Sequence, residues 1–236
     1  MAHLSVHQRR RPASSVELEQ IPWLQLLTRE ERAQVVPRLV VSDPSPGDYV
    51  CRVGRPVTYW FGVVSGLLKM SSDNERGQTM TFTGVPPGGW FGEGTALKRE
   101  SYRYHIQPLR SSVVAGLPVD DFHWLIDHSL GFNRFIMNQL NERLGQFIAA
   151  REIDRLASPD IKVARLLAQL FNPVLFPGVG QMLRITQQEL AYLVGLSRQR
   201  VNEALRTLER HGVIRVEYGG LRVLDLPRLR SAIFVD

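Results

Sequence analysis

The sequence predicts an α+β chain of several domains, with a β-barrel first, a long helix next and a winged helix-turn-helix last. Three observations predict this order. β-Branched and aromatic residues broken by turn signals fill residues 39–118, and a helical apolar period replaces them from about residue 127 to 156. A helix–turn–helix pattern and a hairpin follow at residues 187–224. We place a basic tail and the three domains at residues 1–15, 16–126, 127–157 and 158–236.

The composition is that of a globular protein that is not embedded in a membrane. Of the 236 residues, 44% are hydrophobic and 22% are charged, and the net charge of +6 is compatible with a polyanionic partner such as nucleic acid. The lone cysteine, Cys51, excludes an internal disulfide and a four-thiolate cluster, which favours a reducing cytoplasm. No apolar run is long enough for a membrane span or placed as a signal peptide.

The N-terminal region is expected to begin with a solvated tail. Residues 1–15 are polar and carry three consecutive arginines, Arg9 to Arg11, so we expect a disordered segment, with a DNA-contacting arm as the alternative. Residues 16–37 then predict a short helical region, in which Thr28 and Glu31 form a capping box and Pro37 ends the helix.

The barrel and the long helix are predicted from a change of period. Gly, Pro and Asp/Asn turn signals recur at short intervals between the β-forming runs, as is typical of a sandwich or small barrel. Further on, Ile136, Leu140, Leu144 and Phe147 recur every three or four residues. A helix of about 28 residues would span about 42 Å, more than a small barrel needs as cover. We therefore predict a coiled-coil dimerisation helix, and a core helix lying on the barrel is the alternative.

Residues 187–206 match the pattern of a twenty-residue helix–turn–helix. This unit needs a small fifth residue where the helices nearly touch, a ninth glycine with positive φ, and apolar residues at five core positions. The chain meets all seven requirements, with Leu190, Ala191, Val194, Gly195, Leu196, Val201 and Ala204. Thr186 and Glu189 form a capping box for the first helix, and Ser197 can cap the second.

The second helix carries polar residues suited to reading DNA. Arginine pairs with guanine, and glutamine or asparagine pairs with adenine, whereas the plain alternative is an ordinary solvated face. The candidate DNA-binding residues are Ser197, Arg198, Gln199, Arg200, Asn202, Glu203 and Arg206. The hairpin predicted after Gly212, with its turn at Tyr218-Gly219-Gly220, would form a wing on which Arg215 and Arg222 are candidate phosphate contacts.

Barrel, long helix and winged helix in this order resemble the cAMP receptor protein / fumarate-nitrate regulator (Crp/Fnr) family over about residues 16–230. The most specific stretches are residues 185–202, 205–214 and 88–93 with Arg103. The resemblance implies a jelly-roll barrel of the cyclic-nucleotide-binding kind, a homodimer, and double-stranded DNA as the partner. Arg198 matches the family's guanine-reading arginine, but Gln199 and Glu203 stand where glutamate and arginine are usual, so we expect a different half-site.

For the barrel, the resemblance implies that Gly92, Glu93 and Arg103 hold a cyclic nucleotide such as cAMP. The glycine–glutamate turn and the arginine would meet the phosphate, and the glutamate would take the ribose hydroxyl. Two departures argue against this ligand: Tyr104 replaces a small residue, and residues 147–151 lack the family's Thr-Ser pair.

Other readings of the barrel stay open. One is an ion pair between Glu93 and Arg103 beside a vestigial pocket, in a regulator that needs no effector. Another is a haem sensor, for which the candidate ligands are His3, His7, His105, His123, His128 and His211.

The common enzyme signatures are missing from the sequence. There is no Walker phosphate loop, Gly-x-Ser-x-Gly elbow, His-Glu-x-x-His or Cys-x-x-Cys. We therefore expect a cytoplasmic transcription regulator rather than an enzyme, with a sensor or adaptor lacking DNA output as the alternative. Surface loops such as residues 172–180 could contact RNA polymerase.

Overall fold

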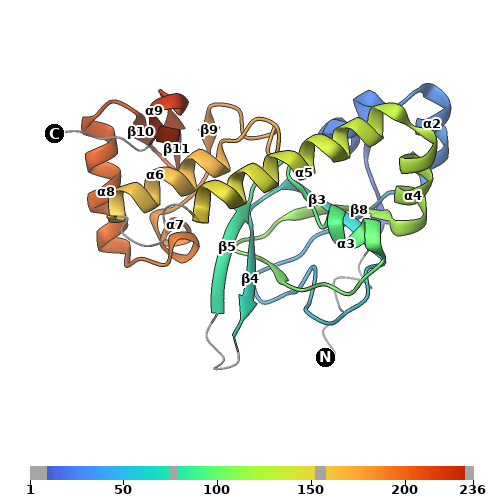
Figure 1. The fold of residues 1–236 in the computed structure, drawn as a ribbon, viewed down its shortest axis with the longest axis horizontal. Helices are drawn as coiled ribbons and strands as arrows, with labels where there is room; N and C mark the ends of the chain where they lie inside the picture. Colours follow the sequence, from blue (N-terminus) through green and yellow to red (C-terminus); the bar gives the residue numbers. More distant parts are fainter. Residues whose placement is uncertain (1–9, 75–78, 152–157, 232–236) are drawn as a thin grey trace.

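The computed structural model describes residues 10–74, 79–151 and 158–231 (Figure 1). Arg9, His3, His7 and the predicted end of the long helix after Arg151 lie outside these residues. The predicted α+β architecture is confirmed: a β-rich region leads through a long helix to a helical region in which a hairpin precedes the last short helix. None of the helices in the described ranges is long and apolar enough to cross a membrane.

Two antiparallel sheets form the β-rich region. The first has the order β1-β2-β8-β3-β6, with bounds Arg11–Pro12, Val40–Ser42, Val113–Pro118, Tyr59–Ser65 and Trp90–Phe91. The second has the order β5-β4-β7, with bounds Thr79–Val85, Leu68–Asp73 and His105–Pro108. Both sheets contribute buried side chains to one apolar core, including Val63, Leu68 and Ile106.

The expectation of a disordered tail is wrong for residues 10–15. Strand β1 pairs with β2, and the Arg10 guanidinium stacks 3.8 Å from the centroid of the Tyr59 ring. Arg11 donates hydrogen bonds of 2.8 and 2.6 Å to Glu17. Ion pairing and strand pairing thus order a segment whose polarity suggested a free tail.

The predicted helical region over residues 16–37 is divided into four short pieces. These are α1 (Ser15–Glu19), the 3-10 helix η2 (Pro22–Leu26), α2 (Arg29–Val35) and the 3-10 helix η3 (Val36–Arg38). The capping box is confirmed, with Glu31 N donating to Thr28 Oγ1 at 3.2 Å and Thr28 N to the Glu31 carboxylate at 2.8 Å. The α-helix ends at Val35, before Pro37.

The long helix begins three residues later than expected. After α3 (Glu93–Lys98), α4 runs over Val119–His128, and α5 runs over Leu130–Arg151. Ser129 is extended, with φ −110° and ψ 104°, and its hydroxyl accepts the Phe132 N–H at 3.3 Å. A capping serine therefore divides what the apolar period presented as one helix.

An aromatic cluster holds the start of α5 on the first sheet. The Trp23 and Phe132 ring centroids lie 5.3 Å apart, and those of Trp60 and Trp90 lie 4.3 Å apart. Trp60 also meets Phe132 edge-on at 5.5 Å. Each such pair contributes about 0.5–1.5 kcal/mol beyond the area it buries. The cluster therefore fixes α5 against η2, β3 and β6.

The C-terminal region is a helical unit closed by a small sheet. Its elements are α6 (Pro159–Leu170), β9 (Met182–Leu183), α7 (Gln187–Val194), α8 (Arg198–Arg210), β10 (Ile214–Glu217), β11 (Gly220–Val223) and α9 (Leu226–Ser231). The predicted wing is confirmed as the antiparallel pair β10–β11, in which Arg215 stands opposite Arg222. Strand β9 adds a third strand beside β11.

The loop at residues 172–180 packs between the two regions. Leu175 and Phe176 are buried, and a Cβ atom added to Gly88 would lie 2.5 Å from the Gly178 nitrogen. Only glycine at residue 88 allows this approach of the two backbones. The loop is therefore only partly exposed, because its buried residues are covered by their own chain. Contact of its exposed residues with RNA polymerase stays a prediction.

Candidate nucleic-acid interface and effector pocket

The helix–turn–helix forms because its core residues are small or apolar where α7 meets α8. Leu190, Val201 and Ala204 are fully buried, and Ala191 is nearly so. Gly195 ends α7 in the left-handed conformation with φ 70°, and its N–H donates to the Ala191 carbonyl at 3.0 Å. A non-glycine residue in this conformation would be strained. The predicted glycine turn is thus confirmed.

Side-chain caps fix the start of both helices. Glu189 N donates to Thr186 Oγ1 at 3.1 Å, and Thr186 N donates to the Glu189 carboxylate at 2.7 Å, which completes the predicted capping box. Arg200 N donates to Ser197 Oγ at 3.3 Å. The caps satisfy backbone donors that the helix itself leaves unpaired. Ser197 is thereby a structural cap as well as a candidate contact.

Helix α8 turns one face to the core and the other to solvent. Val201, Ala204, Leu205 and Leu208 make the buried face. Six of the seven candidate reading residues are exposed, namely the N-cap residue Ser197 and, on α8, Arg198, Gln199, Arg200, Glu203 and Arg206. Asn202, the seventh, is half-buried and accepts a 3.3 Å hydrogen bond from Gln187.

Two side-chain pairs on the exposed surface of α8 and the wing could not be predicted from residue spacing alone. Gln199 Nε2 donates to Glu203 Oε1 at 3.1 Å, one helical turn away. On the wing, Arg222 Nε lies 2.6 Å from Glu217 Oε1, and this hydrogen bond lowers the pKa of the Glu217 carboxyl. Arg215 is exposed. A groove of about 480 Å³ separates the wing from Arg198 and the start of α7.

In the β-rich region, the candidate pocket residues Gly92 and Glu93 open helix α3. Gly92 is left-handed, with φ 85°, and Glu93 is buried. Arg143 of α5 donates to Glu93 Oε1 through Nε and to the Trp90 carbonyl through Nη2. Sequence reasoning missed Arg143, although it lies one turn beyond the buried Gln139 on the inner side of α5. The partner of Glu93 therefore comes from the long helix.

The proposed ion pair between Glu93 and Arg103 is wrong. Arg103 has a side chain that is 79% exposed, and its Nη2 pairs with Glu100 at 3.0 Å. Tyr104 turns inward, so its hydroxyl lies 3.1 Å from the point where a Cβ on Gly92 would stand. Burial raises the pKa of the Tyr104 hydroxyl well above its usual range. The tyrosine thus covers the glycine turn instead of leaving it open.

Comparison with known proteins identifies the family. The model described as "Crp-like helix-turn-helix domain" matches residues 161–232, and "Cyclic nucleotide-binding domain" matches residues 44–129. Transcriptional regulator SdrP of Thermus thermophilus is 30% identical over 177 residues, which cover 72% of this chain and 82% of SdrP. The chain belongs to the Crp/Fnr family of DNA-binding transcription regulators.

One further relative agrees with this assignment, and one solved structure agrees with the fold. The cAMP-activated global transcriptional regulator CRP of Haemophilus influenzae is 27% identical over 178 residues, covering 70% of this chain and 78% of its own. The structure of FixK2 from Bradyrhizobium japonicum superposes with a TM-score of 0.64 at 14% identity. It covers 84% of this Crp/Fnr chain and 98% of FixK2, and it supports the fold alone.

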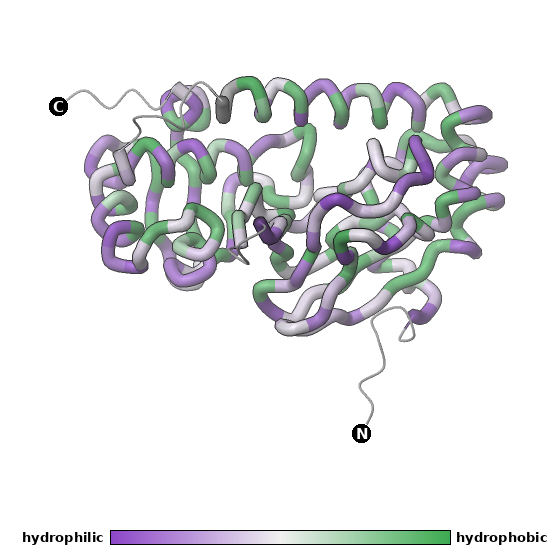
Figure 2. Tube along the Cα trace, turned by 60° about the horizontal axis from the view of Figure 1, so that its bottom comes forward, coloured by the Kyte–Doolittle hydropathy of each residue, from purple (hydrophilic) through white to green (hydrophobic). Residues whose placement is uncertain are grey.

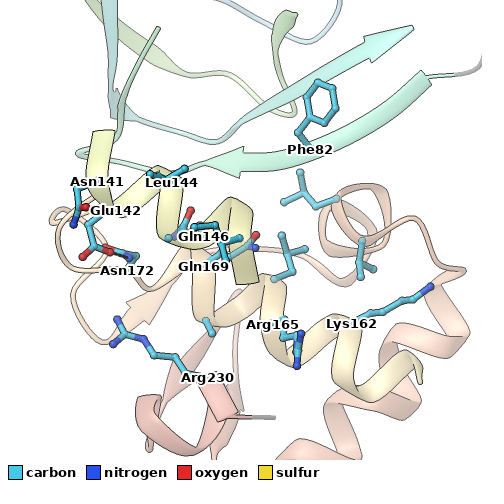
Figure 3. Close-up of a pocket in the computed structure, with 16 residues that line it drawn as sticks. Phe82, Asn141, Glu142, Leu144, Gln146, Lys162, Arg165, Gln169, Asn172 and Arg230 are labelled. Atoms are coloured by element: carbon cyan, nitrogen blue, oxygen red, sulfur yellow. Dashed lines mark hydrogen bonds between the residues drawn. The ribbon is translucent and has the colours of Figure 1, made fainter. Parts of the chain in front are cut away.

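The Crp/Fnr regulator also has a large groove that sequence reasoning missed. It has a volume of about 730 Å³ and lies between α5, α6, α7 and β5 (Figure 3). Apolar side chains such as Phe82, Leu144 and Leu193 line part of it, and Lys162 and Arg165 add positive charge. Leu144 also belongs to the apolar period of α5, so the groove shares this residue with the predicted dimerisation seam.

The histidines of this Crp/Fnr chain that the structure describes are dispersed. His105 Nδ1 accepts from Val53 N at 3.3 Å, His123 Nε2 lies 2.9 Å from the Ala96 carbonyl, and His128 Nδ1 lies 2.8 Å from the Trp124 carbonyl. Within the described ranges, no three His, Cys, Asp or Glu side chains gather as metal ligands. Haem binding stays an untested alternative.

Proposed function

We propose that the chain is a homodimeric regulator that reads a pseudo-palindromic operator with two copies of α8. One observation supports this most strongly: the polar residues of α8 are exposed opposite a fully buried face, beside an exposed Arg215 on the wing. A helix presented in this way can enter a major groove while the wing meets the backbone. In this proposal Arg198 reads guanine, and Arg215 and Arg222 contact phosphates.

The apolar stripe on α5 supports pairing of two copies. Leu130, Met137 and Leu144 are 66%, 56% and 58% exposed and recur every seven residues. Leu140 and Phe147, 37% and 59% exposed, stand three residues after Met137 and Leu144. This is the a/d pattern of a coiled coil, and α5 forms one edge of the molecule, where a second copy can reach it (Figure 2). The inner side of the same helix packs on the β-rich region, as the alternative prediction required.

A two-fold dimer sets the geometry of the DNA site. Symmetry-related recognition helices enter half-sites about 34 Å apart, one turn of DNA. An activating role would add RNA polymerase as a partner, and transcription in vitro with and without the protein distinguishes activation from repression. We place this function in the cytoplasm and propose no catalytic activity, as the relatives are transcription regulators.

Selection of bound sequences from a random duplex library tests the proposal. We expect enrichment of an inverted repeat with half-sites one turn apart, and loss of its guanine preference in Arg198→Ala. A sensor without DNA output, the second candidate function, would enrich no sequence and would bind the library no better than a non-DNA polyanion at low salt.

A further inference from the structure

We propose that Glu209, at the C-terminal end of α8, is a positioning residue that fixes the wing against the recognition helix. Its carboxylate Oε1 accepts a hydrogen bond of 2.9 Å from the backbone N–H of Val216 in β10. The inference rests on the proposed function and deepens it, because it names the residue that keeps the two DNA-contacting elements at a set distance from each other.

The first argument is the place of β10 in its sheet. The strand order is β10-β11-β9, so β11 has a strand on either side and β10 forms an edge. N–H groups on the outer side of an edge strand have no partner within the sheet. Glu209 accepts from one such group across the corner at Gly212, which has φ 68° and separates α8 from the wing. The hydrogen bond therefore joins helix and strand directly.

The second argument is that burial falls along the wing. Ile214, at the base of β10, is 1% exposed, whereas Val216 is 40% exposed and Tyr218, in the turn, is fully exposed. Apolar packing thus fixes the base of the hairpin more firmly than its tip. The Glu209 hydrogen bond acts at Val216, where this burial has already weakened. It is therefore placed to restrain the outer half of the wing.

The third argument is what the restrained segment carries. Arg215, the exposed arginine assigned to the DNA backbone, directly precedes Val216. Arg222, opposite Arg215 across the hairpin, is already bound to Glu217 at 2.6 Å. Since adjacent residues share one backbone, a shift of Val216 carries Arg215 with it. A hydrogen bond weakens steeply once its distance or angle departs from the preferred range. We therefore expect the phosphate contact of Arg215 to depend on Glu209.

Two variants of equal charge isolate this hydrogen bond. Glu209→Gln keeps an oxygen that can accept the Val216 N–H, whereas Glu209→Ala removes it, and both lose the same negative charge. Because Glu209 is exposed, both chains should fold, with closely similar melting temperatures. In the free protein, NMR should show that the Val216 amide exchanges with deuterium faster in Glu209→Ala than in Glu209→Gln. Equal exchange in the two variants would overturn the inference.

DNA binding is the second measurement. Glu209→Ala should bind the selected operator about 2- to 10-fold more weakly than Glu209→Gln, the range expected for one hydrogen bond. The slope of log K against log salt concentration should be smaller in magnitude by about 1 in Glu209→Ala, because Arg215 no longer releases a counterion. The guanine preference assigned to Arg198 should be the same in both variants. A residue that only stabilised the fold would not change the salt slope.

A double-variant cycle shows whether Glu209 acts through Arg215. In an Arg215→Ala background the two Glu209 variants should bind the operator alike, because the contact that Glu209 positions is already absent. The same difference between them in both backgrounds would contradict the inference. If the wild-type chain binds no operator, the proposed function and the inference both fail. If it binds and the two single variants bind alike, the inference alone fails.

Discussion

Arg110 Nη1 lies 3.2 Å from both carboxylate oxygens of Glu189, across the boundary between the β-rich region and the helix–turn–helix. Arg110 Nη2 also donates to the Arg184 carbonyl at 2.7 Å. Glu189 is the capping-box residue of α7, so one carboxylate both starts the first helix of the DNA-binding motif and attaches it to the other domain. The orientation of that motif is therefore set by a contact between domains.

We expect Arg110→Ala to loosen this attachment. The loss should be about 1 kcal/mol, less than for a fully buried charged hydrogen bond, because the Arg110 side chain is 32% exposed. The capping box remains, so α7 itself should persist. Urea unfolding measures the loss, with Arg55→Ala as the control, and equal stability of the two variants would show that the contact is not stabilising.

Arg198→Ala and Arg215→Ala should weaken DNA binding in different ways. Removing a base-reading arginine costs about 1–3 kcal/mol on the specific operator and relaxes preference at one base pair. Removing a phosphate contact weakens binding to all DNA sequences alike. It also lowers the slope of log K against log salt concentration by about 1. Fluorescence anisotropy over a salt series distinguishes the two. Identical profiles for both variants would mean that these two residues do not have the assigned roles.

Glu203→Ala should raise affinity for DNA of any sequence, because it removes a negative charge from the surface that we propose meets DNA. It also frees Gln199, whose amide now donates to Glu203 at 3.1 Å, so base preference at the Gln199 position should change. Library selection with the variant measures both effects. The charge-conserving Glu203→Asp is the control, and an unaltered consensus in Glu203→Ala would contradict a role for this pair in specificity.

Leu144→Lys should give a folded monomer with weak operator binding. The side chain is 58% exposed in the single chain, so folding does not depend on it, whereas a charge in a coiled-coil seam opposes pairing. Loss of bivalent binding should reduce operator affinity by about 10²-fold or more. Sedimentation gives the oligomeric state. Val16→Lys, at a residue that is 67% exposed outside α5, should remain dimeric.

The Arg11–Glu17 pair makes the N-terminal segment sensitive to acid. The hydrogen bond from Arg11 lowers the pKa of Glu17 to about 2. The pair therefore contributes fully above the ordinary carboxylate pKa of about 4.3, and its contribution is lost as the pH falls towards 2. The difference in unfolding free energy between wild type and Glu17→Gln should shrink over this range. A constant difference would show that the ion pair does not stabilise the fold.

Local sequence patterns were sufficient to predict those elements whose structure is decided by residues close together in the sequence. The helix–turn–helix depends on a small residue, a left-handed glycine and two caps within about twenty positions, and each acts on backbone within one or two turns. Gly195, Ser197 and the Thr186–Glu189 box therefore lie as predicted. The long helix was also visible as a period, but its start was misplaced because a single serine cap interrupts the apolar pattern at residue 129.

The sequence by itself determined the order of the domains, the two helices of the helix–turn–helix, the wing and the apolar stripe of α5, because periodicity and capping are local properties. Only the tertiary structure decided that Glu93 pairs with Arg143, fifty residues away, and that Arg103 faces solvent. A buried charge takes whichever cation the folded backbone brings within hydrogen-bond distance, and residue spacing does not specify that neighbour.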